Sequence, residues 1–304
     1  MKVLVTGGTG FVGQHVVSCL KSRGHDVLIA TRQIPKEGQV QFFFYNPEWM
    51  SNVLDKNKIE CIVHLSAKAS VKQSMSMPFE AYESNVSDSI SLLKVLEKKY
   101  RNIKFVYASS AEVYKPDTRI LTESSSLSPV SLYGLSKMFV DEFVRVVARS
   151  ENLKWNVVRP FNTIGVGQSD VYVIASFAKQ IVEMKRGIRE KKLSVGNIEV
   201  CRDFVDVRDV ARAYVDVCEL DDVGEVYNIC SGESVCLSEC VSEMISLVGL
   251  KDVKIEVDSS KLRVSDPERI VGTYNKLKRK VGWGPKTPID QTLSDILQYW
   301  EGKD

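Results

Sequence analysis

The first thirteen residues constrain the fold more than any other part of the sequence. An apolar run, KVLVT at 2–6, leads directly into TGGTGFVG, in which Gly7, Gly10 and Gly13 are regularly spaced. Glycine at these places permits positive φ, brings the main chain close to a pyrophosphate, and lets the following helix pack tightly on the strand. A turn that serves packing alone is the alternative. A strand, this turn and a helix in that order favour a dinucleotide-binding site.

Apolar runs of strand length alternate with helical patterns through the first half of the chain. The later runs lie at 26–31, 61–66, 104–110 and 155–160, and helical patterns lie at 15–23, 90–99 and 131–149. Such alternation predicts an α/β fold in which a doubly wound parallel sheet of the Rossmann type is flanked by helices.

The second half is less regular, although part of it is expected to return to the same sheet. EVYNIC at 225–230 has a strand pattern, whereas 172–187 and 237–248 have helical patterns. We expect two interleaved units. The dinucleotide-binding domain comprises residues 1–165 with a return around 203–232, and a smaller C-terminal substrate-binding lobe comprises 166–202 and 233–304.

The composition narrows the class of partner. The 41 basic and 39 acidic side chains nearly cancel, which argues against a broad cationic surface for nucleic acid or an anionic membrane. The sequence contains no apolar run of about eighteen residues, and its opening lacks the pattern of a secretory signal. We therefore expect a cytoplasmic protein that acts on a small molecule.

The cysteines are odd in number and lie mostly among apolar residues, as reduced core thiols do. They are Cys19, Cys61, Cys201, Cys218, Cys230, Cys236 and Cys240. No disulfide framework is expected. Cys236 and Cys240 have the spacing of one helical turn, but no histidine or second cysteine pair lies near them, so no metal site is predicted.

The end of the second predicted strand bears on the choice of cofactor. Sites that prefer NAD usually carry an acidic residue there, which binds the adenosine ribose hydroxyls. This chain has Thr31 followed by Arg32, and a guanidinium pairs well with a 2′-phosphate. The prediction is NADP(H), with NAD(H) as the alternative cofactor. A solvated loop arginine, in a loop that also contains Lys36, is the competing interpretation of Arg32.

Tyr133 and Lys137 are candidates for acid/base chemistry. They are four residues apart in the helical pattern at 131–149, so both side chains fall on one face. A phenol with a pKa of about 10 is a poor proton shuttle at neutral pH, and a neighbouring ammonium favours the phenolate. Taken alone, the pair would more often be a surface coincidence.

Ser109 and Ser110 follow the run KFVYA and are expected at the carboxyl edge of the sheet, where ligands bind in open α/β folds. Ser110 can donate to a substrate oxygen whose charge changes during reaction. Serine after a strand is often only a turn residue. The order of glycine turn, strand-end serine and tyrosine–lysine pair makes the catalytic interpretation specific.

Six segments together resemble the extended short-chain dehydrogenase/reductases over essentially the whole chain. They are TGGTGFVG, HLSAKASV, YASSAEVY, YGLSK, RPFNTIG and RDFVDVRDVA. The resemblance implies that Ser110, Tyr133 and Lys137 form a catalytic triad and that Lys137 also holds the nicotinamide ribose. It also implies a set of cofactor-binding residues, namely Gly7, Thr9, Gly10, Phe11, Val12, Gly13, Arg32, Leu65, Ser66, Ala67, Ser109, Tyr133, Lys137 and Pro160.

Within that family, RPFNTIGVGQS, FAKQIVEMKRG, VGNIEVCRDFVDVRDV and YNICSG are most similar to GDP-4-keto-6-deoxy-D-mannose reductases, which make GDP-D-rhamnose. This similarity implies that the nucleotide-sugar contacts Asn162, Lys179, the segment from Val195 to Asn197, Arg202 and Arg263. The chain departs from its relatives at Asn46, at Lys115 and at 263–266, and these departures leave the nucleotide base open.

The same scaffold supports reduction, 4-epimerisation and 4,6-dehydration, so the reaction depends on the site. Glu112 stands where similar dehydratases place a proton-abstracting base, although similar reductases also carry glutamate there; a helix-starting or ribose-orienting carboxylate is the simpler interpretation. The predicted NADP preference argues against an epimerase. We therefore predict reduction of the C4 ketone of a nucleotide-linked 4-keto-6-deoxyhexose by NADPH.

Two further expectations concern the class of protein and its assembly. A non-catalytic NADP-sensing regulator is the hypothesis of another class, but such proteins typically lack the tyrosine or the lysine, and this chain has both. The helical patterns around 83–98 and 131–149 carry apolar faces on both sides. In similar proteins these helices pair across a two-fold axis, which predicts a homodimer.

Overall fold

The computed structural model describes residues 1–68, 77–117, 119–262 and 266–303. Its centre is a seven-stranded sheet in which every neighbouring pair is parallel. Across the sheet the strands are β11 (Glu225–Ile229), β6 (Trp155–Pro160), β5 (Lys104–Ala108), β4 (Cys61–His64), β1 (Lys2–Thr6), β2 (Asp26–Thr31) and β3 (Gln39–Gln41). The predicted Rossmann-type sheet is confirmed, including the return of the strand near 225.

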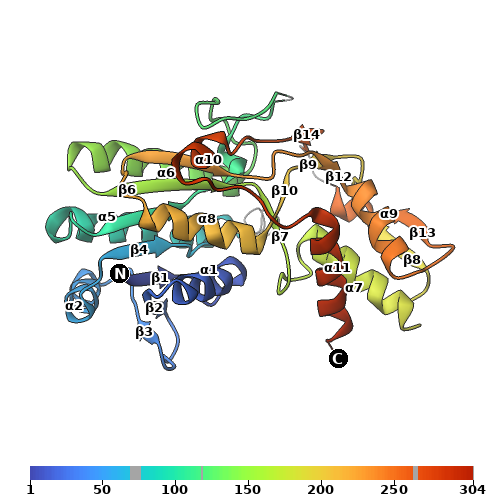
Figure 1. Ribbon diagram of the computed structural model, residues 1–304, viewed down its shortest axis with the longest axis horizontal. Coiled ribbons are helices and arrows are strands. Elements are labelled where there is room, and N and C mark those ends of the chain that lie inside the picture. Colours follow the sequence, from blue (N-terminus) through green and yellow to red (C-terminus); the bar gives the residue numbers. More distant parts are fainter. Residues whose placement is uncertain (69–76, 118, 263–265, 304) are drawn as a thin grey trace.

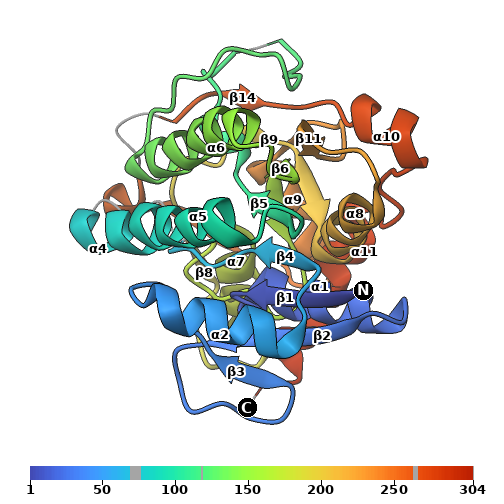
Figure 2. The ribbon, with the colours of Figure 1, turned by 90° about the vertical axis from the view of Figure 1, so that its left-hand side faces the viewer.

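Helices cover both faces of this sheet (Figure 2). On one face lie α2 (Pro47–Asn57), α5 (Asp88–Lys99) and α6 (Leu132–Ser150), and on the other lie α1 (Phe11–Ser22), α8 (Val207–Glu219) and α10 (Asn275–Val281). Because side chains alternate along a strand, Leu4 of β1 joins the first apolar core and Val3 and Val5 join the second. A strand buried on both faces explains why the centre of β1, from Val3 to Val5, is continuously apolar.

A smaller lobe has its own apolar core and lies beyond the edge toward which β1 runs (Figure 1). It contains α7 (Val173–Lys185), β8 (Lys192–Val195), α9 (Leu237–Leu247), β13 (Lys254–Val257) and α11 (Ile289–Glu301). Shorter strands lie between the units, with β7 (Asn162–Ile164) beside β10 (Phe204–Asp206), and β9 (Cys201–Arg202) between β12 (Val235–Cys236) and β14 (Arg269–Ile270).

Short helical turns complete the described elements. They are α4 (Pro78–Tyr82), the π-helix η1 (Glu83–Ser87), and the 3₁₀ turns η2 (Ala111–Val113) and η3 (Ser259–Lys261). In the part of the chain that the structure describes, no helix is long and apolar enough to cross a membrane.

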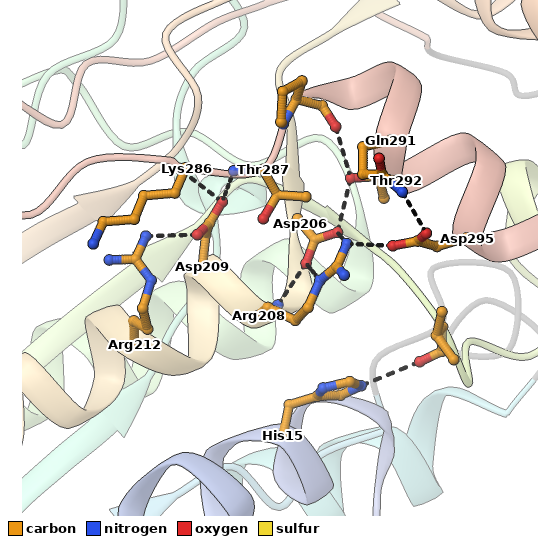
Figure 3. Close-up of polar contacts among 12 residues, drawn as sticks. His15, Asp206, Arg208, Asp209, Arg212, Lys286, Thr287, Gln291, Thr292 and Asp295 are labelled. Carbon is orange, nitrogen blue, oxygen red and sulfur yellow. Dashed lines mark hydrogen bonds and ion pairs between the residues drawn. The ribbon is translucent and has the colours of Figure 1, made fainter. Parts of the chain in front are cut away.

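The segment RDFVDVRDVA forms a polar joint between the sheet and the lobe (Figure 3). Asp206 caps α8 by accepting from the Arg208 amide at 2.7 Å and also accepts from the Thr292 hydroxyl of α11 at 2.7 Å. Asp209 accepts from two backbone amides near the start of α11, and Arg208 pairs with Asp295 at 2.8 Å. We call Asp206, Arg208, Asp209, Thr292 and Asp295 the joint cluster.

The expectation of reduced cysteines was wrong for one pair. Cys201 of β9 and Cys236 of β12 stand directly opposite each other in an antiparallel pair and are joined by a disulfide, although 35 residues separate them in sequence. Neither an odd number of cysteines nor their apolar neighbours reveals which strands pair. The other cysteines are free, and Cys240 is buried.

Candidate active site

The carboxyl ends of β1 and β4 flank the glycine turn. Gly7 has φ +71°, and a Cβ there would lie 2.8 Å from the Ser66 amide nitrogen. A Cβ on Gly13 would lie 2.1 Å from the Gly7 carbonyl oxygen. Gly10 precedes α1 with no side-chain hydrogen bond to cap that helix. A tight turn with helix amides left to face an anion fits a dinucleotide pyrophosphate.

The neighbouring residues expected to line the cofactor also lie at this edge. Leu65 donates its amide to the Thr6 carbonyl at 3.1 Å, and Ser66 donates to the Thr6 hydroxyl at 3.3 Å. The segment from Leu65 to Ala67 is therefore held beside the glycine turn. On the other side, the Gln14 side chain donates to the Thr9 carbonyl at 2.9 Å, and Phe11 and Val12 begin α1.

Arg32 follows β2, at the place expected for a 2′-phosphate contact. Its guanidinium already forms an ion pair with Asp88, the first residue of α5, and lies 5.8 Å from the centre of the Phe44 ring. The sequence interpretation of Arg32 did not include this carboxylate, because 56 residues separate the two.

Ser110 and Tyr133 meet where η2 and α6 begin. Ser131 caps α6 by accepting from the Gly134 amide at 3.0 Å, and a Cβ on Gly134 would lie 2.3 Å from the Glu112 carbonyl oxygen. This close approach sets the start of α6 directly against η2. The Ser110 hydroxyl lies close enough to the Tyr133 hydroxyl to lower its pKa.

The environment of Tyr133 differs from the sequence expectation. Burial raises the pKa of the Tyr133 hydroxyl above its usual value, and the nearby Ser110 hydroxyl opposes that shift without outweighing it. The expectation that Lys137 would favour the phenolate therefore does not describe this arrangement, because loss of solvation is the larger effect. Tyr133 is a neutral phenol at neutral pH.

Lys137 is buried one turn further along α6. Its ammonium donates to the Ala108 carbonyl at 2.6 Å and lies 5.0 Å from the centre of the Tyr107 ring. Burial lowers the pKa of Lys137 to about 7, while the Asp141 carboxylate acts in the opposite direction. The ammonium thus faces the end of β5.

Glu112 is partly buried beside this pair. The Ser131 hydroxyl donates to its carboxylate at 3.3 Å, and its charge contributes to the raised pKa of Tyr133. The structure therefore places a carboxylate at the start of α6, close enough for its charge to act on the tyrosine.

A buried polar group beneath these residues was missed by the sequence reasoning. Asp141 accepts from the Ser109 hydroxyl at 2.6 Å and from two nitrogens of Arg159 at 2.8 and 2.9 Å. The side chains of Asp141 and Arg159 are 0% and 1% exposed. We call Ser109, Asp141 and Arg159 the core cluster. Its only local signal was an aspartate four residues after Lys137, one turn along the same helix.

Among the residues expected to bind substrate, Asn162 and Arg202 lie on the short strands between sheet and lobe. Asn162 of β7 follows closely on Pro160, the last residue of β6, and donates its amide to the Asp203 carbonyl at 3.1 Å. Arg202 of β9 is buried, pairs with Asp266 and donates to the Pro267 carbonyl at 2.7 Å.

The remaining residues of that set lie in the lobe or outside the described residues. Lys179 of α7 pairs with Asp170 at 2.7 Å, and the Asn197 side chain accepts from the Glu199 amide at 3.1 Å. Val195 is 0% exposed, so its side chain belongs to the core of the lobe. Arg263 lies outside the residues that the structure describes.

The fold and this edge define the class, an NAD(P)-dependent enzyme of the extended short-chain dehydrogenase/reductase type. The sequence profile of the family described as GDP-mannose 4,6 dehydratase matches residues 4–296. The chain belongs to this family, whose relatives here are nucleotide-sugar reductases, epimerases and dehydratases.

Individual relatives are similar to this protein along almost the whole chain. A GDP-6-deoxy-D-mannose reductase of Pseudomonas aeruginosa is 30% identical over 99% of this chain and 98% of its own length. A UDP-glucose 4-epimerase of Corynebacterium glutamicum is 28% identical over 98% of this chain and 95% of its own length. Among solved structures, the RMD protein of Pseudomonas aeruginosa complexed with NADPH superposes with a TM-score of 0.87, at 29% identity and 99% coverage of both chains.

Proposed function

We propose that this enzyme uses NADPH to reduce the C4 ketone of a nucleotide-linked 4-keto-6-deoxyhexose, with GDP-4-keto-6-deoxy-D-mannose as substrate and GDP-D-rhamnose as product. The full-length similarity to a GDP-6-deoxy-D-mannose reductase carries the proposal. Support from the site comes from the serine, tyrosine and lysine gathered at the edge of the sheet beside a glycine cradle.

The roles of the residues follow from their protonation states. Bound NADPH would supply the hydride that converts the ketone into an alkoxide. Tyr133, held neutral by burial, has a proton to donate to that oxygen, and Ser110 orients the oxygen through its hydroxyl. Lys137 provides a positive charge next to the reacting groups while it is protonated.

The set proposed to bind NADP(H) surrounds the glycine turn and the ends of β2, β4, β5 and β6. Arg32 is the proposed partner of the 2′-phosphate, and Lys137 that of the nicotinamide ribose. For the nucleotide-sugar, we propose Asn162 near the sugar, Lys179 and the segment from Val195 to Asn197 along the nucleotide, and Arg202 with Arg263 at the diphosphate.

Dehydration is the second candidate, and one observation favours it. Glu112 is a carboxylate at the start of α6 whose charge acts on Tyr133, and a base there could remove a proton next to a transient ketone. Its contact with the Ser131 hydroxyl at the start of α6 also fits an orienting role, which is the interpretation we adopt.

The deciding experiment follows NADPH oxidation at the nicotinamide absorbance with GDP-4-keto-6-deoxy-D-mannose as substrate. Oxidation by the native enzyme and its loss in Tyr133→Phe support the reductase. Tyr133→Phe is a matched change because it removes only the hydroxyl. No oxidation by the native enzyme contradicts the assignment, and conversion of GDP-mannose itself would establish a dehydratase. Tight NADP binding without turnover of any nucleotide-sugar would indicate a regulator.

We also propose a homodimer formed through the helices at 83–98 and 131–149, which are η1 with α5 and α6 and contact each other on one side of the sheet (Figure 2). Large apolar side chains are exposed on α6 and on α4, which precedes η1, including Phe79 at 85%, Phe139 at 49% and Val146 at 66%. Light scattering at micromolar concentration should give twice the chain mass, and Phe139→Asp should lower it. A monomeric native protein contradicts the proposal.

A further inference from the structure

The residue that the sequence assigns to a 2′-phosphate is held by a carboxylate from another element. Arg32 follows β2, and Asp88 begins α5 immediately after the π-helix η1. Their side chains form an ion pair, with the guanidinium also placed over the Phe44 ring at 5.8 Å. Any anion that binds Arg32 at this face therefore meets a carboxylate already in contact with it.

The charges around Arg32 are not those of an open anion site. The Asp88 side chain is 20% exposed, compared with 58% for Arg32. Burial raises the pKa of Asp88, the charge of Glu83 raises it further, and Arg32 opposes both. The Arg32 guanidinium thus faces the Asp88 carboxylate, which itself experiences the charge of Glu83, and the positive potential available to a phosphate is lower than the sequence alone suggests.

We propose that Asp88 determines cofactor selectivity by competing with the 2′-phosphate for Arg32, so that the enzyme discriminates weakly between NADPH and NADH. To bind Arg32, the 2′-phosphate of NADPH must displace Asp88 or share the guanidinium with it, and in both cases it approaches the negative charge of Asp88. NADH has no 2′-phosphate and therefore does not compete with Asp88. This inference rests on the proposed cofactor site, in particular on Arg32 at the adenosine end of the dinucleotide.

The test measures binding rather than turnover. Dissociation constants for NADPH and for NADH are obtained by titrating each reduced cofactor, followed by nicotinamide fluorescence, into native protein and Asp88→Asn. Because exposed ion pairs contribute up to about 1 kcal/mol, the variant should bind NADPH about three- to fivefold more tightly. Its affinity for NADH should change less than about twofold. Asp88→Asn keeps the size of the side chain and removes its charge.

Two comparison variants make the result specific. Asp55→Asn removes another partly exposed carboxylate, which pairs with Lys99 at 2.8 Å, and should leave both affinities unchanged. Arg32→Ala should weaken the binding of NADPH but not that of NADH. When it is combined with Asp88→Asn, the tighter NADPH binding caused by Asp88→Asn should disappear.

Equal or weaker NADPH binding by Asp88→Asn, with NADH unchanged, would overturn the proposal and would make Asp88 a residue that orients Arg32 for the phosphate. Failure of the native protein to bind either dinucleotide would instead refute the cofactor site itself, and the role of Asp88 would fall with it.

Discussion

The core cluster and the joint cluster both combine aspartate, arginine and a hydroxyl side chain, but their arginines lie in different surroundings. In the core cluster, Asp141 and Arg159 are almost completely buried under the catalytic edge. In the joint cluster, the Arg208 side chain is 46% exposed and is shared between Asp206 and Asp295 (Figure 3). A charge removed from water depends wholly on its partners, whereas an exposed charge retains its solvation. The number of hydrogen bonds that a cluster makes therefore does not set its energetic importance.

Removing a charge from the core cluster should produce the largest loss of stability. Asp141→Asn leaves the Arg159 guanidinium buried without a counter-charge, so the free energy of unfolding should fall by about 3–5 kcal/mol. Urea unfolding followed by circular dichroism measures it. The double variant Asp141→Asn with Arg159→Met removes both charges and should recover much of the loss. A double variant less stable than the single variant would show that stability does not depend on charge pairing.

Substitutions in the joint cluster should cost less stability than Asp141→Asn, and the largest loss within it is expected at Asp209. This buried side chain accepts from the Lys286 and Thr287 amides at 2.9 Å, and Asp209→Ala removes the acceptor of both partly buried donors. The expected loss of stability is about 1–3 kcal/mol. Trp283 donates to the Asp209 carbonyl at 3.2 Å and gives a fluorescence signal at the same place. A loss as large as that of Asp141→Asn would remove the distinction between the two clusters.

The core cluster also bears on the chemistry, because the Asp141 carboxylate supports the charge of Lys137. The pKa of Lys137 is about 7, below the usual value, so the ammonium is present at lower pH and is lost as the pH rises through about 7. Within the proposed reductase activity, kcat/KM should fall on the alkaline side of that value by at most tenfold per pH unit.

A variant that keeps the charge at position 137 tests whether Lys137 is responsible for that fall. Lys137→Arg stays charged throughout, so its residual activity should lack the alkaline fall. Two other groups lie close: Tyr107, whose ring faces the ammonium and whose own pKa is raised by burial, and His64, whose pKa burial lowers to about 3. Neither titrates near pH 7. An unchanged pH profile in Lys137→Arg would assign the fall to another residue.

Sequence reasoning succeeded where the determining interactions are local. The predicted strand at 155–160 and the predicted helix at 131–149 match β6 (Trp155–Pro160) and α6 (Leu132–Ser150) closely. Apolar runs and helical spacing are properties of neighbouring residues, and the glycine turn is recognisable because strand, turn and helix are consecutive.

The failures share a different cause, which is dependence on residues distant in sequence. The pairing of Arg32 with Asp88, that of Asp141 with Arg159, and the Cys201–Cys236 disulfide each require the tertiary arrangement. The raised pKa of Tyr133 has the same origin, because spacing along a helix indicates a neighbouring charge but does not reveal how far the hydroxyl is removed from water.

The smallest loss of stability is expected for substitution of Arg208, the half-exposed arginine of the joint cluster. Arg208→Ala should lower the free energy of unfolding by about 1 kcal/mol, because the guanidinium is half exposed and keeps part of its solvation, although its partner Asp206 is buried. Asp206 keeps its bonds from the Arg208 amide, which alanine retains, and from the Thr292 hydroxyl. The difference between native protein and Arg208→Ala should shrink in high salt, whereas that caused by Asp141→Asn should persist, because salt does not screen a buried pair. Equal salt sensitivity of the two variants would mean that burial does not separate the clusters.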